Sequence, residues 1–139
     1  MIKAFLFPKN THSAAASLAL LLLRVAFGGA LLVHGWSKLA NFEATTQQLA
    51  AMGGAGAAVL VVFAEVFCAA GLILGLLYRL ALIPLVINMF VAFFIAHGGR
   101  LVGENNGEMA FLYLAVFVAL MIAGSGKYAV DSLLFGKKN

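Results

Sequence analysis

Four long apolar segments dominate the chain and constrain its fold more than any other feature. They run from about Ala14 to Trp36, Ala55 to Tyr78, Leu80 to His97 and Met109 to Ala123. A membrane-spanning helix needs about 20 apolar residues, so four spans leave only tails and short loops in 139 residues. Because backbone groups inside a bilayer must bond to one another and four strands cannot close a barrel, each segment is predicted to be a helix.

The scarcity of charged residues agrees with this prediction. Only 10% of the residues are charged and 64% are hydrophobic, whereas a soluble domain carries about 25% charged residues. We therefore predict an all-α, polytopic membrane protein, a four-transmembrane-helix bundle that forms a single membrane domain over residues 1–139 and contacts membrane lipid. The Lys and Arg residues stand singly at the ends of apolar segments, without an aromatic-interleaved basic stripe, which excludes nucleic acid as a partner.

The distribution of Lys and Arg predicts the topology. One side of the predicted bundle carries six of these residues: Lys3, Lys9, Arg79, Lys127, Lys137 and Lys138. The other side carries two, Lys38 and Arg100. Since basic residues accumulate in cytoplasmic loops, both termini are predicted to be cytoplasmic. Residues 37–54 then lie on the outer face, as either a short interfacial helix or an ordinary loop.

The single cysteine narrows the redox chemistry. Cys68 lies within the second apolar segment, so the chain has neither an intramolecular disulfide nor a CxxC pair. Because thiol-based electron transfer to a quinone needs at least two thiols, a self-contained disulfide-forming enzyme is excluded.

Two histidines are predicted to lie near the outer boundary on different helices. His34 and His97, with Lys38, Glu104 and Glu108, are expected to form a solvated, titratable cluster there. Their separation in sequence has no metal-ligand spacing, so no metal site is predicted. Haem is not expected either, because the membrane edge offers little apolar depth for a porphyrin.

Two charged residues interrupt the apolar segments. Arg24 and Glu65 each lie about ten residues, or ~15 Å, from the predicted start of their antiparallel helices. Since a charge near the bilayer centre costs roughly 2.5 to 3.5 kcal/mol, the two are predicted to form an ion pair at mid-depth. Asn88 on the third helix is expected to reach the same level. This group is either a structural pin between helices or a proton or ligand site.

Small residues mark two candidate packing faces. Gly28 and Gly35 lie on the same stripe of the first helix as Arg24. They either let a neighbouring helix approach closely or leave room for a cavity. The Gly71-x-x-x-Gly75 pattern in the second helix is predicted to be a close-packing face.

The order of these motifs resembles the DoxX family of small four-helix membrane proteins. The residues that carry the resemblance are Arg24, His34-Gly35-x-x-Lys38-Leu39, Phe42, Gly53 to Gly56, Glu65, the run from Ala70 to Gly75, Arg79, His97 and Gly124 to Asp131. The resemblance covers about Leu18 to Leu133.

The resemblance implies a broad function. Some relatives are subunits of thiosulfate:quinone oxidoreductase, others are linked to oxidative-stress complexes, and many are unassigned. It therefore implies quinone-linked redox chemistry in a bacterial inner membrane, with Arg24, Glu65 and His97 at the family's polar positions. The chain has no nucleotide, flavin or iron–sulfur motif and no covalently bound cofactor is expected, so electrons come from a partner or pass through the quinone alone.

Three functions remain open from the sequence. The leading hypothesis is a membrane subunit whose polar site binds a quinone within an apolar cavity. The second is a small proton-coupled transporter in which Glu65 alternates between a proton and a cation, although an adjacent Arg24 opposes this. The third is a membrane anchor for a soluble redox partner. The expected protein partner is accordingly a redox protein or a second copy of the chain.

Overall fold

The computed structural model describes residues 1–7 and 11–135, and these residues form helices and loops without strands. The helices are α1 (Ile2–Leu6), α2 (Ala14–Ala40), α3 (Phe42–Gln48), η1 (Ala50–Met52), α4 (Ala55–Val62), η2 (Phe63–Cys68), α5 (Ala69–Leu74), α6 (Tyr78–Phe90), η3 (Val91–Ala96), α7 (Glu108–Ala123) and α8 (Val130–Phe135). Of these, η2 and η3 are π-helical. The predicted all-helical bundle is confirmed.

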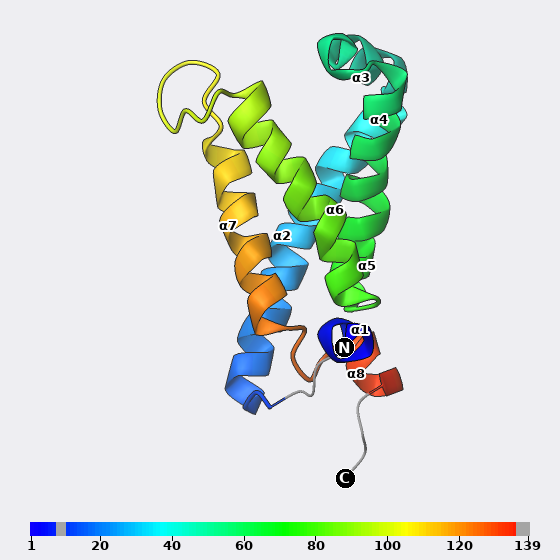
Figure 1. The fold of residues 1–139 in the computed structure, drawn as a ribbon, viewed down its shortest axis with the longest axis vertical. Helices are drawn as coiled ribbons and strands as arrows, with labels where there is room; N and C mark the ends of the chain where they lie inside the picture. Colours follow the sequence, from blue (N-terminus) through cyan, green and yellow to red (C-terminus); the bar gives the residue numbers. More distant parts are fainter. Residues whose placement is uncertain (8–10, 136–139) are drawn as a thin grey trace.

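Three continuous helices are long and apolar enough to cross a membrane: α2, the composite α4–η2–α5 and the composite α6–η3. The fourth apolar helix, α7, has 16 residues, a length of ~24 Å that is shorter than the ~30 Å hydrocarbon core. Figure 1 shows these four running along the long axis of the molecule. The chain is therefore a multi-pass membrane protein.

The two ends of the bundle differ in what they carry. The first and last described helices, α1 and α8, lie at one end, here called the terminal end, and α3 and the loop between η3 and α7 lie at the other, here called the loop end (Figure 1). The predicted placement of both termini on one side agrees with this arrangement.

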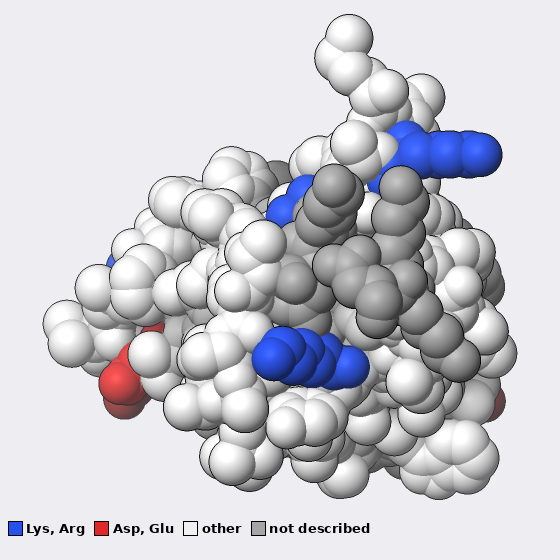
Figure 2. All heavy atoms as spheres, turned by 90° about the horizontal axis from the view of Figure 1, so that it is seen from below, with Lys and Arg blue, Asp and Glu red and all other residues white. Residues whose placement is uncertain are grey.

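Basic side chains gather at the terminal end. Figure 2 shows Lys and Arg there, with acidic residues only at the rim. Lys3 belongs to α1, and Arg79 at the start of α6 donates from Nη1 to the Phe5 carbonyl over 2.7 Å. Lys127 lies in the segment before α8. The predicted Lys9, Lys137 and Lys138 lie outside the described residues.

The first helix is longer than predicted. Its start is capped by Ser13, whose hydroxyl accepts from the Ala16 backbone N–H over 3.1 Å. Its end is at Ala40, four residues beyond the predicted Trp36. Lys38 is therefore part of the last turn of this helix. The segment that follows forms the short helix α3. Of the two alternatives for residues 37–54, a short helix or an ordinary loop, the structure therefore supports the helix.

The second and third apolar segments leave only Tyr78-Arg79 as the predicted turn between their helices, and this prediction is wrong. The second helix ends at Leu74 and α6 already begins at Tyr78, so the turn is formed by residues 75–77. Gly75 has a φ of 67°, a left-handed conformation that glycine adopts without strain. The Asp131 carboxylate accepts the N–H groups of Leu77 and Tyr78 over 2.9 and 2.8 Å, and so caps α6 from 54 residues away in sequence.

The sequence predicts Pro84 in about the first turn of the third helix, whereas the structure places it deeper in α6. Because α6 starts at Tyr78, the proline is the seventh helical residue rather than part of the first turn. Its missing N–H therefore removes a bond from the helix interior.

The core of the bundle is apolar and extends along the bundle, from Leu20 to Phe93 and Ala110. Its large side chains with no exposed surface include Leu72, Leu82, Leu85 and Phe117, contributed by α5, α6 and α7. Many other apolar side chains are exposed on the outer faces of the helices, such as Leu22, Val33 and Ile122. A lipid-facing surface accounts for this pattern, since hydrocarbon chains solvate such side chains well.

Candidate functional site

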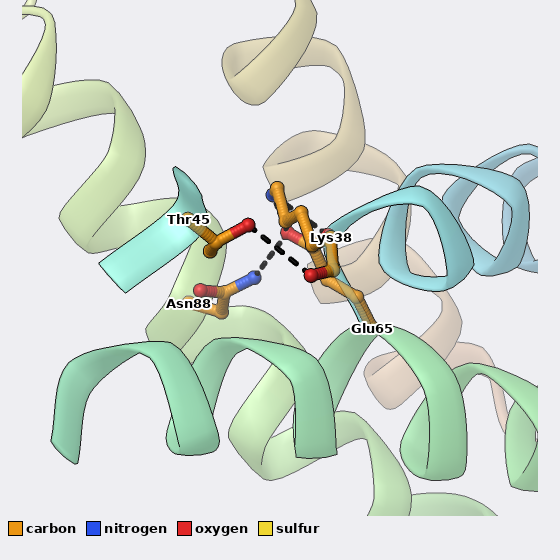
Figure 3. Close-up of polar contacts among 4 residues, drawn as sticks. All are labelled: Lys38, Thr45, Glu65 and Asn88. Carbon is orange, nitrogen blue, oxygen red and sulfur yellow. Dashed lines mark hydrogen bonds and ion pairs between the residues drawn. The ribbon is translucent and has the colours of Figure 1, made fainter. Parts of the chain in front are cut away.

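Two groups of buried polar side chains lie inside the bundle. The Glu65 cluster consists of Lys38, Thr45, Glu65 and Asn88 and is drawn in Figure 3. The Arg24 cluster consists of Arg24, Tyr78 and Asp131. Both place ionisable groups where a bilayer makes them costly, so each needs an explanation.

The carboxylate of Glu65 is the centre of the first cluster. The Lys38 ammonium lies 2.7 Å from both Oε1 and Oε2, and Asn88 Nδ2 donates to Oε1 over 3.1 Å (Figure 3). These side chains come from α2, η2 and α6. The Glu65 side chain is 3% exposed and that of Lys38 is 36% exposed. The prediction that Asn88 reaches the central carboxylate is confirmed.

A glycine makes this contact between helices possible. A Cβ built on Gly35 would lie 2.6 Å from Glu65 Cβ and 2.7 Å from the Glu65 carbonyl carbon. Any side chain at position 35 would therefore push the helix that carries Glu65 away from Lys38. Gly28 allows α2 and α5 to pack closely nearer the terminal end, since a Cβ built on it would lie 2.8 Å from Ile73 Cγ1. The two glycines are packing sites rather than walls of a cavity.

The backbone around Lys38 is held by the neighbouring short helix. Thr45 of α3 donates its hydroxyl hydrogen to the carbonyl of Lys38 or of Asn41, at 3.2 and 3.1 Å. Thr45 is itself buried. This contact ties α3 to the last turn of α2. The end of α2, from which Lys38 reaches Glu65, is therefore fixed by a side chain that sequence reasoning did not single out.

Measured along α2, Glu65 lies closer to the loop end than to the terminal end. Gly35, which touches it, is five residues from the end of α2 and 21 residues from its start. At 1.5 Å per residue these separations are about 8 and about 31 Å. Along its own helix, Ala55–Leu74, Glu65 stands near the middle, so the difference comes from the longer terminal-end part of α2.

Arg24 is fully buried and bonds only to backbone carbonyls. Nε donates to Leu72 over 3.0 Å and Nη2 to Ile73 over 2.9 Å, both in the last turn of α5. Nη1 donates to Ser125 and Tyr128, each over 2.9 Å. The last carbonyls of a helix lack partners and carry partial negative charge, so a guanidinium is well suited to this position.

The rest of the Arg24 cluster joins the same segments. The Tyr78 hydroxyl donates to the Leu120 carbonyl over 2.8 Å, and the Tyr78 ring lies 5.9 Å from the Arg24 guanidinium carbon. Asp131 caps α6, and its own N–H donates to the Gly75 carbonyl over 3.0 Å. Four of the five guanidinium hydrogens are committed to the chain itself. The arrangement holds α5, the start of α6 and the C-terminal segment together.

The predicted Arg24–Glu65 ion pair is wrong. Gly35 of α2 lies against Glu65, and Gly28 lies against Ile73, so Arg24 faces the end of α5. The eight positions between Glu65 and Ile73 correspond to ~12 Å along the helix. Counting inward from the predicted helix starts assumed that both helices begin level with the membrane faces. The contacts of the two glycines set a different register.

The other predicted site residues do not join the Glu65 cluster. His34 is exposed on α2, and Glu108 is exposed at the first position of α7. His97 is half-buried, with Nδ1 2.6 Å from the Ala92 carbonyl oxygen. Lys38, expected beside these residues, bonds to Glu65 instead. Within the described residues, no group of three or more His, Cys, Asp or Glu is placed to hold a metal ion.

Comparison with known proteins identifies relatives of the chain. A family model described as DoxX matches residues 19–98, which include Arg24, Lys38, Glu65 and Asn88. A protein of Haemophilus influenzae, described as uncharacterized, is 31% identical over 122 residues, covering 83% of this chain and 90% of its own length. No solved structure matches the chain.

Proposed function

Because this chain belongs to the DoxX family of small membrane proteins, we propose that it is a quinone-linked redox subunit of the bacterial inner membrane. Its Glu65 cluster holds the quinone headgroup, and its termini face the cytoplasm. The proposal rests above all on one observation. A carboxylate that is 3% exposed bonds through both oxygens to a lysine and through one to an amide, inside the helical bundle.

The donors and acceptors of the cluster fit a quinone headgroup. The Lys38 ammonium and the Asn88 amide are donors for carbonyl oxygens, and the Glu65 carboxylate is an acceptor for hydroxyl groups. A headgroup therefore finds both kinds of partner within one small site. Ligand sites of this kind combine an apolar lining with a few convergent polar groups.

Aromatic side chains lie on the helices that carry the cluster. Phe63 and Phe67 of the Glu65 helix stack with ring centroids 6.0 Å apart, and Phe90 and Phe94 of the Asn88 helix are 4.6 Å apart. All four rings are about half exposed or more. They give a lipophilic ligand an aromatic surface on the bilayer side, because aromatic faces pack well against rings and chains.

The residues of the cluster have separate parts in the proposed activity. A bound quinone would supply two-electron, two-proton chemistry, with a redox partner protein exchanging the electrons. Glu65 is the group that accepts and holds a proton. Lys38 balances the Glu65 charge, and Asn88 fixes the orientation of Oε1. Gly35 keeps the two helices close enough for these contacts.

The single tryptophan offers a direct test of quinone binding. Trp36 is exposed on α2, two residues before Lys38. We expect a short-chain ubiquinone analogue to quench its fluorescence saturably in purified protein. Glu65→Gln and Asn88→Leu should each weaken binding about tenfold, the effect of losing one hydrogen bond to a charged or buried partner. Lys127→Met, at the opposite end, is the control. Equal quenching in all variants would mean that the quinone only dissolves in the detergent.

A proton-coupled transporter is the second candidate, and the identity of the cation beside Glu65 favours it. The partner is Lys38 rather than Arg24, and an ammonium on a flexible stem is displaced more easily than a permanently charged, planar guanidinium. A cationic substrate would then replace Lys38 at the carboxylate. If vesicles exchange an organic cation for protons and Glu65→Gln stops the exchange, this function replaces the redox proposal. A plain membrane anchor would need neither activity.

A further inference from the structure

We propose that Glu65 exchanges its proton with the loop end of the molecule only, by way of Lys38, while the apolar core and the Arg24 cluster close the route to the terminal end. The inference rests on the proposed function for its biological meaning. A redox reaction at the site would then release or take up its protons on one face of the membrane. Its physical content, a one-sided proton route, is independent of which ligand binds.

The route to the loop end is short and polar. Glu65 lies level with Gly35, about 8 Å from the end of α2. Lys38, one turn further along, contacts both carboxylate oxygens while 36% of its side chain is exposed. A single side chain therefore reaches from the buried carboxylate to the surface of the molecule. Long lysine stems often bridge these two environments in membrane proteins.

The route to the terminal end is long and closed. It spans about 31 Å of α2. On α6, the fully buried Leu82 and Leu85 lie between Asn88, which bonds to Glu65, and Tyr78, which lies beside Arg24. Beyond them, Arg24 bonds to four carbonyls of α5 and the C-terminal segment. A buried guanidinium is in addition an electrostatic barrier to the entry of a proton.

The charged and titratable groups that face Glu65 are few. α2 supplies Lys38, and α7 supplies Tyr113, which lies within electrostatic range of the carboxylate. From α6 comes the neutral Asn88. The helices α4 and α5 carry no ionisable residue, and η2 carries only Cys68 besides Glu65. Lys38 is the group among these that combines contact with Glu65 and exposure.

The proton step conserves mass and charge. Glu65 takes a proton from a bound donor and becomes a neutral acid, which leaves the Lys38 ammonium without its counter-charge. Lys38 then gives one proton to water at the loop end and receives the proton of Glu65, which restores the ion pair. One proton leaves the site for each cycle, and no electron moves in the relay itself. Two cycles match the two protons of a quinol.

The test is a measurement of charge movement in proteoliposomes of known orientation on a solid-supported membrane. An acidic pH step applied to the loop-end face of the unmodified protein should move charge inward. The same step applied to the terminal-end face should not. Glu65→Gln should abolish the signal, and Lys38→Met should slow it about tenfold or more, the usual cost of losing a proton relay group.

A matched control separates the relay from general surface charge. Lys127→Met makes the same substitution at the terminal end, and its signal should equal that of the unmodified protein. Equal signals from both faces, or a signal that survives in Glu65→Gln, would overturn the one-sided route. The charge-movement measurement uses no quinone. A negative result in it is therefore distinct from a negative result in the quinone-binding experiment. The measurement on unmodified protein stays decisive if a variant fails to fold.

Discussion

Arg24 and Glu65 are both buried charges in the same pair of helices, yet their partners differ in kind. Arg24 bonds to four backbone carbonyls, which neither titrate nor leave their places. Glu65 bonds to two side chains, one of which, Lys38, is partly exposed and carries its charge on a flexible stem. The first arrangement stabilises one structure, whereas the second permits a change of state. Burial alone therefore does not distinguish structural from functional charges in this bundle.

The largest effect is expected from Arg24→Leu. The substitution leaves four buried carbonyls without a donor and removes the link between α5 and the C-terminal segment. We expect a loss of about 3 to 5 kcal/mol of stability, which is typical when one partner of a buried charged network is removed. Thermal unfolding of the purified protein measures it. Arg24→Lys should rescue little, because an ammonium cannot reproduce the planar set of donors. Full rescue would show that only the charge matters.

Gly35→Ala should have the next largest effect. The added methyl group meets the Glu65 backbone and Cβ, so the helices must separate at a cost of about 1 to 3 kcal/mol. Thermal unfolding measures this loss of stability. Titration of the same variant with the quinone analogue should also show weaker quenching of Trp36 fluorescence. Gly29→Ala is the matched control, since nothing lies within 4 Å of a Cβ at that position. Equal destabilisation by both alanines would mean that the contact at Gly35 is not what positions Glu65.

Lys38→Met should destabilise less, by about 1 to 2 kcal/mol, because Lys38 is partly exposed and solvent screens part of the interaction. Combining it with Glu65→Gln should recover much of the loss, since the uncompensated carboxylate is gone. A double-mutant cycle on thermal stability measures this coupling. If the losses of stability in the two single variants simply add in the double variant, the Lys38–Glu65 ion pair contributes nothing to stability. The difference drawn above between the partners of Glu65 and those of Arg24 would then lose support.

Asp131→Asn should have the smallest effect, about 1 kcal/mol, from the weakened cap of α6. It belongs to the structural cluster, so quinone binding and loop-end proton movement should stay unchanged after the fold is verified. Thermal unfolding and Trp36 quenching on the same sample provide both readouts. Loss of quinone binding in this stable variant would show that the two clusters are coupled.

The helical bundle was predictable because apolar run length is a local property of the sequence. The ends of the helices were less so. The turn at Gly75 depends on a cap from Asp131 and on the Arg24 contacts, both made by residues distant in sequence. Gly75 ends the helix in a left-handed conformation and was the local signal, but the Gly71-x-x-x-Gly75 pattern assigned it to a packing face.

The site was predicted in part. Glu65 and Asn88 were expected to meet, and they do. The partner cation was missed because Lys38 stands in the last turn of α2 and resembles a surface residue, while its long stem reaches inward. The glycines held the missing signal, since Gly28 and Gly35 set the register between the helices. Sequence spacing alone gave no measure of that register.

The Arg24 cluster at the terminal end also imposes an order on synthesis. Arg24 enters the membrane with α2, but two of its acceptors belong to Ser125 and Tyr128, and the cap of α6 comes from Asp131. Ser125 and Tyr128 follow Arg24 by about a hundred residues, which takes ~5 to 20 seconds at ~5–20 residues per second. Until then Arg24 can bond only to Leu72 and Ile73, and the start of α6 stays uncapped until Asp131 is added, 53 residues after Tyr78. The C-terminal segment therefore completes the hydrogen bonds at the terminal end only after all four long helices have been made.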